Sequence, residues 1–244
     1  MNRFAIPQIV KKPVEVQATD VLRDAIVTGA IPAGARVTEI QVSEQLNLSR
    51  ATVRQAFRQL ANEGLLNLVP YTGWTVLALS AHDVWELYTL RSAVERLAAQ
   101  LLAKSLDDQK AARLGASYDA LVKECGRGHA ARIAEADFAL HKEIIQLAGH
   151  SRLETQYALI EQQIRMYIRS SDALIPERES IIEQHKPIVD AILSHNADKA
   201  GRLSEQHNLT EGEKLSSHLK IAEENGKRAS KRPRGEKKKS QPRA

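Results

Sequence analysis

The sequence has few aromatic residues, one cysteine and no long hydrophobic run. Aromatic residues make up 4% of the chain against 43% hydrophobic residues in all, so the core must be mainly aliphatic, which suits a helical protein. The single Cys125 excludes an intramolecular disulfide. No stretch of about 18 apolar residues is present, so no membrane span is predicted. Residues 1–12 lack the apolar segment of a secretion signal, and we expect a cytoplasmic protein.

Positive charge is concentrated at the C-terminal end. Residues 227–244 hold nine Lys and Arg side chains and one acid, whereas the whole chain has a net charge of +5. Residues 223–244 contain too little apolar surface to fold, and we expect a disordered basic tail. It could add sequence-independent attraction to phosphate, or it could be a solvated segment without a specific role.

Residues 1–79 show the pattern of a winged helix–turn–helix. Gly and Pro residues end a first helix, Thr38 and Ser49 are placed to cap two further helices, and two short strands follow. This order is typical of a DNA-binding domain. The helices are expected at residues 14–27, 38–46 and 49–63, and the strands at 65–69 and 74–79.

The third of these helices has the features of a recognition helix. Arg50, Thr52 and Arg54 cluster in its first turns, while its apolar residues lie on the other face. Arginine can pair with guanine, and hydroxyls and the amides at a helix start suit phosphates. An ordinary surface helix with two arginines is the alternative interpretation.

Residues 80–222 have helical periodicity throughout, with breaks that predict about six helices. The fold class is therefore mainly α, with a winged helix–turn–helix followed by an all-α bundle. Asp137 and His141 are four residues apart and share one helix face. His185 and His207 are equidistant from a predicted turn at residues 194–198, so they could meet across a helical hairpin.

Each of these four side chains interrupts an apolar stripe, where an unpaired polar group is costly. Carboxylate and imidazole form a common ligand set for a divalent transition metal. Hydrogen-bonded core histidines are the alternative. The stripes are Ala134, Asp137, His141, Ile144 and Ala148; Ile181, His185, Ile188 and Ile192; and Ala200, Leu203 and His207.

Two motif sets in this order resemble the GntR superfamily of transcription factors. The N-terminal set is Ile31-Pro32-x-Gly34-x-Arg36-Val37-x-Glu39, then Ser49-Arg50-Ala51-Thr52-Val53-Arg54-Gln55-Ala56-Phe57-x-x-Leu60-x-x-Glu63-Gly64-Leu65, then Gly73 at the wing tip. The second set, Arg91-Ser92-Ala93-Val94-Glu95 followed by Asp137-x-x-x-His141, His185 and His207, resembles the FCD domain of the FadR group. The six expected helices resemble its shorter, VanR-like variant.

The chain departs from the family pattern at three places. Thr52 stands where the family often has Pro, and Gln55 where it often has Glu; neither change removes the capacity to contact DNA. Pro187 follows His185 by two residues and should remove one helical hydrogen bond and favour a kink.

The resemblance implies a homodimeric, ligand-responsive regulator that binds an inverted repeat in double-stranded DNA. Ser49, Arg50, Thr52, Arg54 and Gly73 would contact the DNA. The four ligands above would hold Zn, Ni or Mn, and a small organic acid would bind beside the ion.

Two arginines are candidates for contacting that effector. Arg91 shares an inward helical phase with Leu87, Val94 and Ala98, although an ion pair with Glu95 is the alternative. Arg165 is the other candidate. Two rival functions stay open: a metal-dependent hydrolase, and a DNA-binding protein whose metal site is purely structural.

Overall fold

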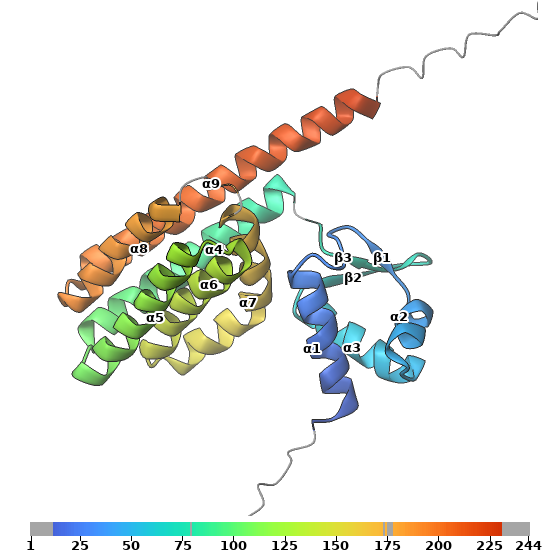
Figure 1. Ribbon diagram of the computed structural model, residues 1–244, viewed down its shortest axis with the longest axis horizontal. Helices are drawn as coiled ribbons and strands as arrows, with labels where there is room; N and C mark the ends of the chain where they lie inside the picture. The colour runs from blue at the N-terminus through green and yellow to red at the C-terminus, as the bar shows by residue number, and fades with distance from the viewer. Residues whose placement is uncertain (1–11, 79, 173, 175–177, 231–244) are drawn as a thin grey trace, which may run out of the picture.

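A computed structural model describes residues 12–78, 80–172, 174 and 178–230. The chain forms an N-terminal module with a small sheet and a C-terminal helical bundle (Figure 1). The module contains α1 (Val14–Val27), β1 (Arg36–Val37), α2 (Glu39–Leu46), α3 (Arg50–Asn62), β2 (Leu66–Val69) and β3 (Gly73–Val76). The bundle contains α4 (Ala81–Lys104), α5 (Asp108–Arg127), α6 (Ala130–Leu147), α7 (Ser151–Asp172), α8 (Arg178–Leu193) and α9 (Ala197–Ser230).

Local capping positions the two helices of the helix–turn–helix as predicted. The hydroxyl of Thr38 accepts from the backbone N–H of Gln41 at 3.2 Å, and the hydroxyl of Ser49 accepts from that of Thr52 at 3.1 Å. Asn47 adopts a left-handed conformation between the helices. The apolar face of α3, including Val53, is buried against α1. Its polar side chains Arg50 and Arg54 lie on the other face and are exposed.

The wing has one strand more than the sequence predicted. The strand order is β1-β3-β2, and β1 pairs antiparallel with β3. Val69 pairs with Gly73, so the turn is formed by residues 70–72 and Tyr71 is the fully exposed residue at its tip. The expectation that Gly73 lies at the wing tip is therefore wrong: Gly73 opens β3 with a φ of 104°, a value that favours glycine.

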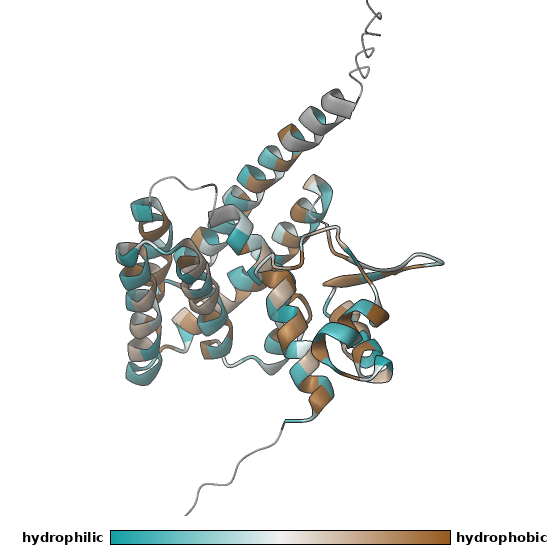
Figure 2. Ribbon diagram, turned by 45° about the vertical axis from the view of Figure 1, so that its right-hand side comes forward, coloured by the Kyte–Doolittle hydropathy of each residue, from teal (hydrophilic) through white to brown (hydrophobic). Residues whose placement is uncertain are grey.

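The six bundle helices match the six that were predicted, and their hydrophobic and hydrophilic residues lie on different sides (Figure 2). α4 and α9 pack along each other. Two glycines allow this close approach, because a Cβ added to Gly201 would lie 2.5 Å from Gln100 and one added to Gly212 would lie 2.6 Å from Tyr88. Glycine inside a helix lowers the stability of that helix, and here the close packing of α9 on α4 offsets this cost.

α9 is longer than the sequence predicted, and it extends beyond the other bundle helices (Figure 1). It ends at Ser230, so the expected disorder from residue 223 is wrong for residues 223–230. Extending an existing helix needs no new nucleus, and five of residues 223–230 are Glu, Lys, Arg or Ala, which have high helix propensity. The rest of the predicted tail, residues 231–244, lies outside the described residues. None of the described helices is long and apolar enough to cross a membrane.

Candidate functional site

The bundle brings the four predicted ligands together from three helices. Asp137 and His141 lie on α6, His185 on α8 and His207 on α9. The ligand nitrogens of the three histidines lie within 4.8 Å of one another. The rings of His185 and His207 have their centroids 4.4 Å apart, which confirms that they meet across the α8–α9 hairpin.

Hydrogen bonds fix the orientation of two of the imidazole rings. Nδ1 of His141 donates to Oε2 of Glu95 at 2.7 Å, and Nδ1 of His185 lies 2.7 Å from the carbonyl oxygen of Ile181. In a neutral ring, a proton on Nδ1 leaves a lone pair on Nε2. When both rings are neutral in this way, both Nε2 atoms face the centre of the cluster as ligands. α8 continues through Pro187 without disturbing this arrangement.

The three best-placed ligand atoms form a nearly equilateral triangle. Oδ1 of Asp137 lies 3.1 Å from Nε2 of His141 and 3.1 Å from Nε2 of His185, and the two nitrogens are 3.1 Å apart. Oδ1 has no hydrogen-bond donor although it is buried. Ligands about 2.1 Å from one ion and at right angles to each other are separated by about 3.0 Å. The donor set and its spacing therefore fit a divalent metal ion.

The charges around the cluster favour the metal-binding forms of His207 and Asp137. Burial opposes a charge on His141, but Glu95 raises the pKa of that ring above its ordinary value, so that a bound ion would have to displace a proton from it. Burial lowers the pKa of His207 well below its ordinary value, and the neighbouring His185 and His141 lower it further, so its imidazole is neutral. Burial opposes ionisation of Asp137, but His185 and His141 together hold its pKa well below the usual range. A neutral imidazole and a carboxylate are the forms that bind metal.

Glu95 on α4 organises the polar groups behind the ligands. Its Oε1 accepts from Nε of Arg91 at 2.7 Å, and its Oε2 also accepts from Nδ2 of Asn208 at 2.9 Å. The alternative expectation for Arg91, an ion pair with Glu95, is therefore present. Nη2 of Arg91 and the hydroxyl of Tyr157 are nevertheless buried without a hydrogen-bond partner.

Tyr157 and Asn208 were not predicted as members of this site, and Glu95 was predicted only as an ion-pair partner of Arg91. Glu95 lies four residues after Arg91 and so shares its face of α4, a signal that could have identified it. On α9 the buried face carries polar side chains, Ser204, Asn208 and Glu211, with His207 at its partly buried edge. The predicted stripe, which contains Leu203 and His207, therefore lies at the edge of the buried face of α9 and not at its centre.

A cleft of about 230 Å³ leads from the surface to His207 between α8 and α9. Its walls include Glu183, Gln206, Glu211 and Lys214. Of the four ligand candidates, His207 is the one that lines this cleft, whereas Asp137, His141 and His185 are buried behind it.

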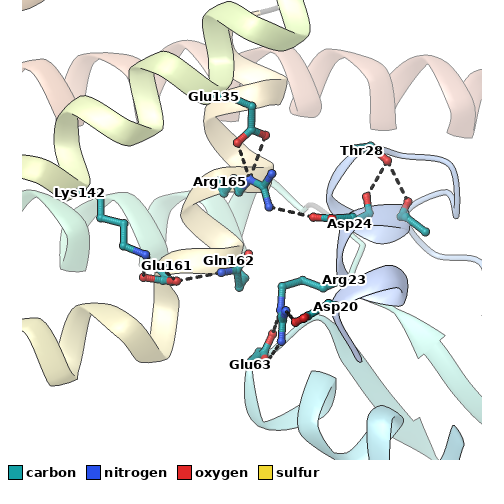
Figure 3. A network of polar contacts seen from close by, with 11 residues as sticks. Asp20, Arg23, Asp24, Thr28, Glu63, Glu135, Lys142, Glu161, Gln162 and Arg165 are labelled. Carbon is teal, nitrogen blue, oxygen red and sulfur yellow. Dashed lines mark hydrogen bonds and ion pairs between the residues drawn. The ribbon is translucent and has the colours of Figure 1, made fainter. Parts of the chain in front are cut away.

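Arg165 lies away from the histidine cluster. Its Nε atom is 2.8 Å and 2.9 Å from the two carboxylate oxygens of Glu135 on α6, and its Nη1 atom is 3.2 Å from Oδ1 of Asp24 on α1 (Figure 3). Arg165 therefore connects the bundle with the DNA-binding module, and no described contact brings it to the predicted effector site.

Four of the five predicted DNA-contacting residues lie at one end of α3, and the fifth, Gly73, lies on β3 of the wing. Arg50 is exposed, Ser49 and Thr52 lie 2.9 Å apart through their hydroxyls, and Arg54 is half-exposed. Glu39 on α2 holds Arg54 through two hydrogen bonds of 2.9 Å and 2.7 Å, a contact that the sequence did not predict. Glu39 thereby orients the guanidinium group beside the start of α3.

Comparisons with known proteins identify a known domain in each part of the chain. Residues 15–76 match the model for "Bacterial regulatory proteins, gntR family", and residues 86–210 match the FCD domain model. The chain is 29% identical over 204 residues to the "Probable D-xylose utilization operon transcriptional repressor" of Paenarthrobacter nicotinovorans, covering 83% of this chain and 87% of that protein. It is 28% identical over 200 residues to the "HTH-type transcriptional repressor RspR" of Escherichia coli, covering 80% and 86%.

Solved structures share the fold. The structure of E. coli McbR/YncC superposes with a TM-score of 0.71 at 18% sequence identity, covering 85% of this chain and 99% of that one. At this identity the likeness concerns the arrangement of helices and strands alone.

Proposed function

This chain belongs to the GntR family of bacterial regulatory proteins and carries an FCD domain. On that premise we propose that the protein is a repressor, and that a small carboxylate bound beside a divalent metal ion releases it from DNA. Family membership makes the chain a DNA-binding transcriptional regulator and not an enzyme. The metal-dependent hydrolase considered from the sequence is therefore set aside.

The triangle of Asp137, His141 and His185 is the single observation that carries the proposal. Its three atoms are hydrogen-bond acceptors when the two rings donate through Nδ1, so they repel one another unless a cation lies among them. Asp137, His141, His185 and His207 would hold the ion. A bound Zn, Ni or Mn ion with open coordination positions would supply a Lewis-acidic centre for an anionic ligand.

Two unpartnered groups near the cluster support a carboxylate as that ligand. Buried polar groups are nearly always hydrogen-bonded, yet Nη2 of Arg91 and the hydroxyl of Tyr157 have no partner. The pKa of Tyr157 is raised well above its ordinary value, by burial first and then by Glu95, so the hydroxyl keeps its proton and can donate. A guanidinium and a phenol are both suitable donors to a carboxylate.

We further propose a homodimer that reads an inverted repeat, because the two-fold symmetry of a dimer matches that of such a site. Leu90, Ala93 and Leu97 form an exposed apolar stripe on α4, and the two leucines are 50% and 43% exposed. A second copy could cover this stripe. Light scattering should then show a dimer, and Leu90→Glu or Leu97→Glu should shift it toward the monomer.

A ligand screen on metal-loaded and metal-stripped protein tests the effector proposal. Small mono- and dicarboxylates, with and without hydroxyl groups, are scored by thermal shift with Zn²⁺ and with EDTA. Acids that bind are then tested for release of a DNA site selected from random sequences with the wild-type protein. The proposal predicts that an acid stabilises only metal-loaded protein and weakens its DNA binding.

Tyr157→Phe provides a sharper version of this screen, since it removes one hydroxyl and retains the ring. The variant should bind metal normally and bind the acid more weakly. Tyr167→Phe is the matched control, because Tyr167 is a buried tyrosine of the same helix about 15 Å further along. Equal stabilisation by acids with and without metal would show that the metal has only a structural role.

A further inference from the structure

α7 contacts the DNA-binding module at two places. Arg165 pairs with Asp24 on α1 at 3.2 Å, and Nε2 of Gln163 donates to the backbone carbonyl of Glu63, the C-cap of α3, at 3.3 Å. We refer to these two interactions as the α7 contact. It joins the bundle to the first helix of the module and to the end of its recognition helix.

The second of these interactions is closely packed. Gly64 follows α3 with a φ of 70°, and a Cβ added there would lie 2.0 Å from Nε2 of Gln163. The carboxylate of Glu63 in turn accepts from Arg23 of α1 at 2.7 Å and 2.8 Å (Figure 3). The end of α3 is thus fixed both to α1 and to α7, so a displacement of Gln163 would act on the whole module.

The first interaction is linked to the histidine cluster through α6. Glu135, which holds Arg165 with both carboxylate oxygens, lies two residues before Asp137. A movement of α6 that accompanies ligand binding at Asp137 or His141 would therefore move the carboxylate on which Arg165 depends. Tyr157, one of the unpartnered donors, lies on the same helix as Arg165.

We propose that the α7 contact sets the orientation of the DNA-binding module, and that occupancy of the histidine cluster changes this orientation through Glu135 and Arg165. The second part rests on the function proposed above. Asp24 is 66% exposed, and exposed ion pairs are weak and screened by salt. A weak contact suits this role, because a ligand can alter an equilibrium only by its differential affinity for the two states.

Distance measurements between paired spin labels test the first part. One label is attached at Gln45→Cys on α2 and the other at Lys123→Cys on α5, two exposed positions, while the native Cys125 is buried. Labelled full-length protein is mixed with excess unlabelled protein so that each dimer carries one labelled subunit. Neither DNA nor an effector is needed.

Arg165→Gln, Asp24→Asn and Gln163→Ala should each broaden the distance distribution or shift its mean. The double variant Arg165→Gln/Asp24→Asn should match Arg165→Gln, because the pair with Asp24 is already lost in that single variant. Arg152→Gln, an exposed arginine on α7, is the control and should leave the distribution unchanged. An unchanged distribution in all three α7-contact variants would overturn the proposal.

Comparing Zn²⁺-loaded with EDTA-treated protein tests the second part. The wild-type distribution should differ between the two forms, and Glu135→Gln should reduce that difference while retaining bound zinc. If zinc binds and the wild-type distribution does not respond, the coupling is overturned although the proposed metal site stands. If no zinc binds, the metal site and the coupling both fail, and the first experiment still decides the role of the α7 contact.

Discussion

Glu95 and His141 form a hydrogen bond inside the bundle, with Oε2 of Glu95 2.7 Å from Nδ1 of His141 and both side chains 2% exposed. The two residues come from different helices, α4 and α6. Their contact sets the tautomer in which His141 presents Nε2 to the proposed metal site. A carboxylate behind a ligand histidine also makes the imidazole a better ligand.

Glu95→Gln should weaken metal binding about 10- to 100-fold, because the neutral amide no longer supports His141 in this way. Competition titration with a chelator of known affinity measures the change. Glu205→Gln is the control, since Glu205 pairs with Arg96 in a partly exposed contact on α9. Equal metal affinity in Glu95→Gln and wild type would show that Glu95 does not position His141.

Arg91→Met should destabilise the folded protein by about 3–5 kcal/mol, because it leaves Glu95 without its buried cationic partner. Urea unfolding of metal-stripped protein measures this change without a contribution from the ion. Arg113→Met removes an arginine that is half-exposed and pairs with Glu143 at 2.8 Å. It should change stability by no more than about 1 kcal/mol, and similar losses in both variants would contradict the importance of the buried pair.

Arg50→Ala and Arg54→Ala should each weaken binding to the selected DNA site about 10- to 100-fold if each arginine reads a guanine. Fluorescence anisotropy at fixed salt gives the affinities, with random DNA as the control. Loss of a base contact reduces specific binding far more than binding to random DNA, whereas loss of a phosphate contact reduces both. Unchanged specific affinity in both variants would refute the recognition-helix assignment.

Deletion of residues 231–244 should reduce binding to random DNA and flatten its salt dependence. The segment contains seven Lys and Arg side chains and one acid, and each lost phosphate contact lowers the log–log slope by about 0.9. Discrimination between the selected site and random DNA should stay the same or improve. An untouched salt slope would mean that the tail does not engage DNA.

Helix positions and the ligand set could be predicted because they depend on local signals. The capping side chains of Thr38 and Ser49 marked helix starts, and the phase of Asp137 and His141 marked one face of α6. The symmetric spacing of His185 and His207 about a turn predicted their meeting. Each of these inferences needs only one helix or one hairpin.

Features that depend on which elements pack together could not be predicted. β1 has two residues and exists through its pairing with β3. Glu95 joins Asn208 across 113 positions of sequence, and Arg165 binds Asp24 because α7 lies against α1. The polar buried face of α9 likewise follows from its packing on α4, which hydrophobic periodicity alone cannot specify.

Metal content is the most direct test of the proposed site. Elemental analysis of protein purified without chelator should find about one Zn, Ni or Mn ion per chain. His141→Ala and His207→Ala should lose the ion and melt at lower temperature, because a ligand that binds only the folded state stabilises it. His218→Ala, an exposed histidine on α9, should retain it. Full metal content in both His141→Ala and His207→Ala would contradict the account and leave these residues as core histidines.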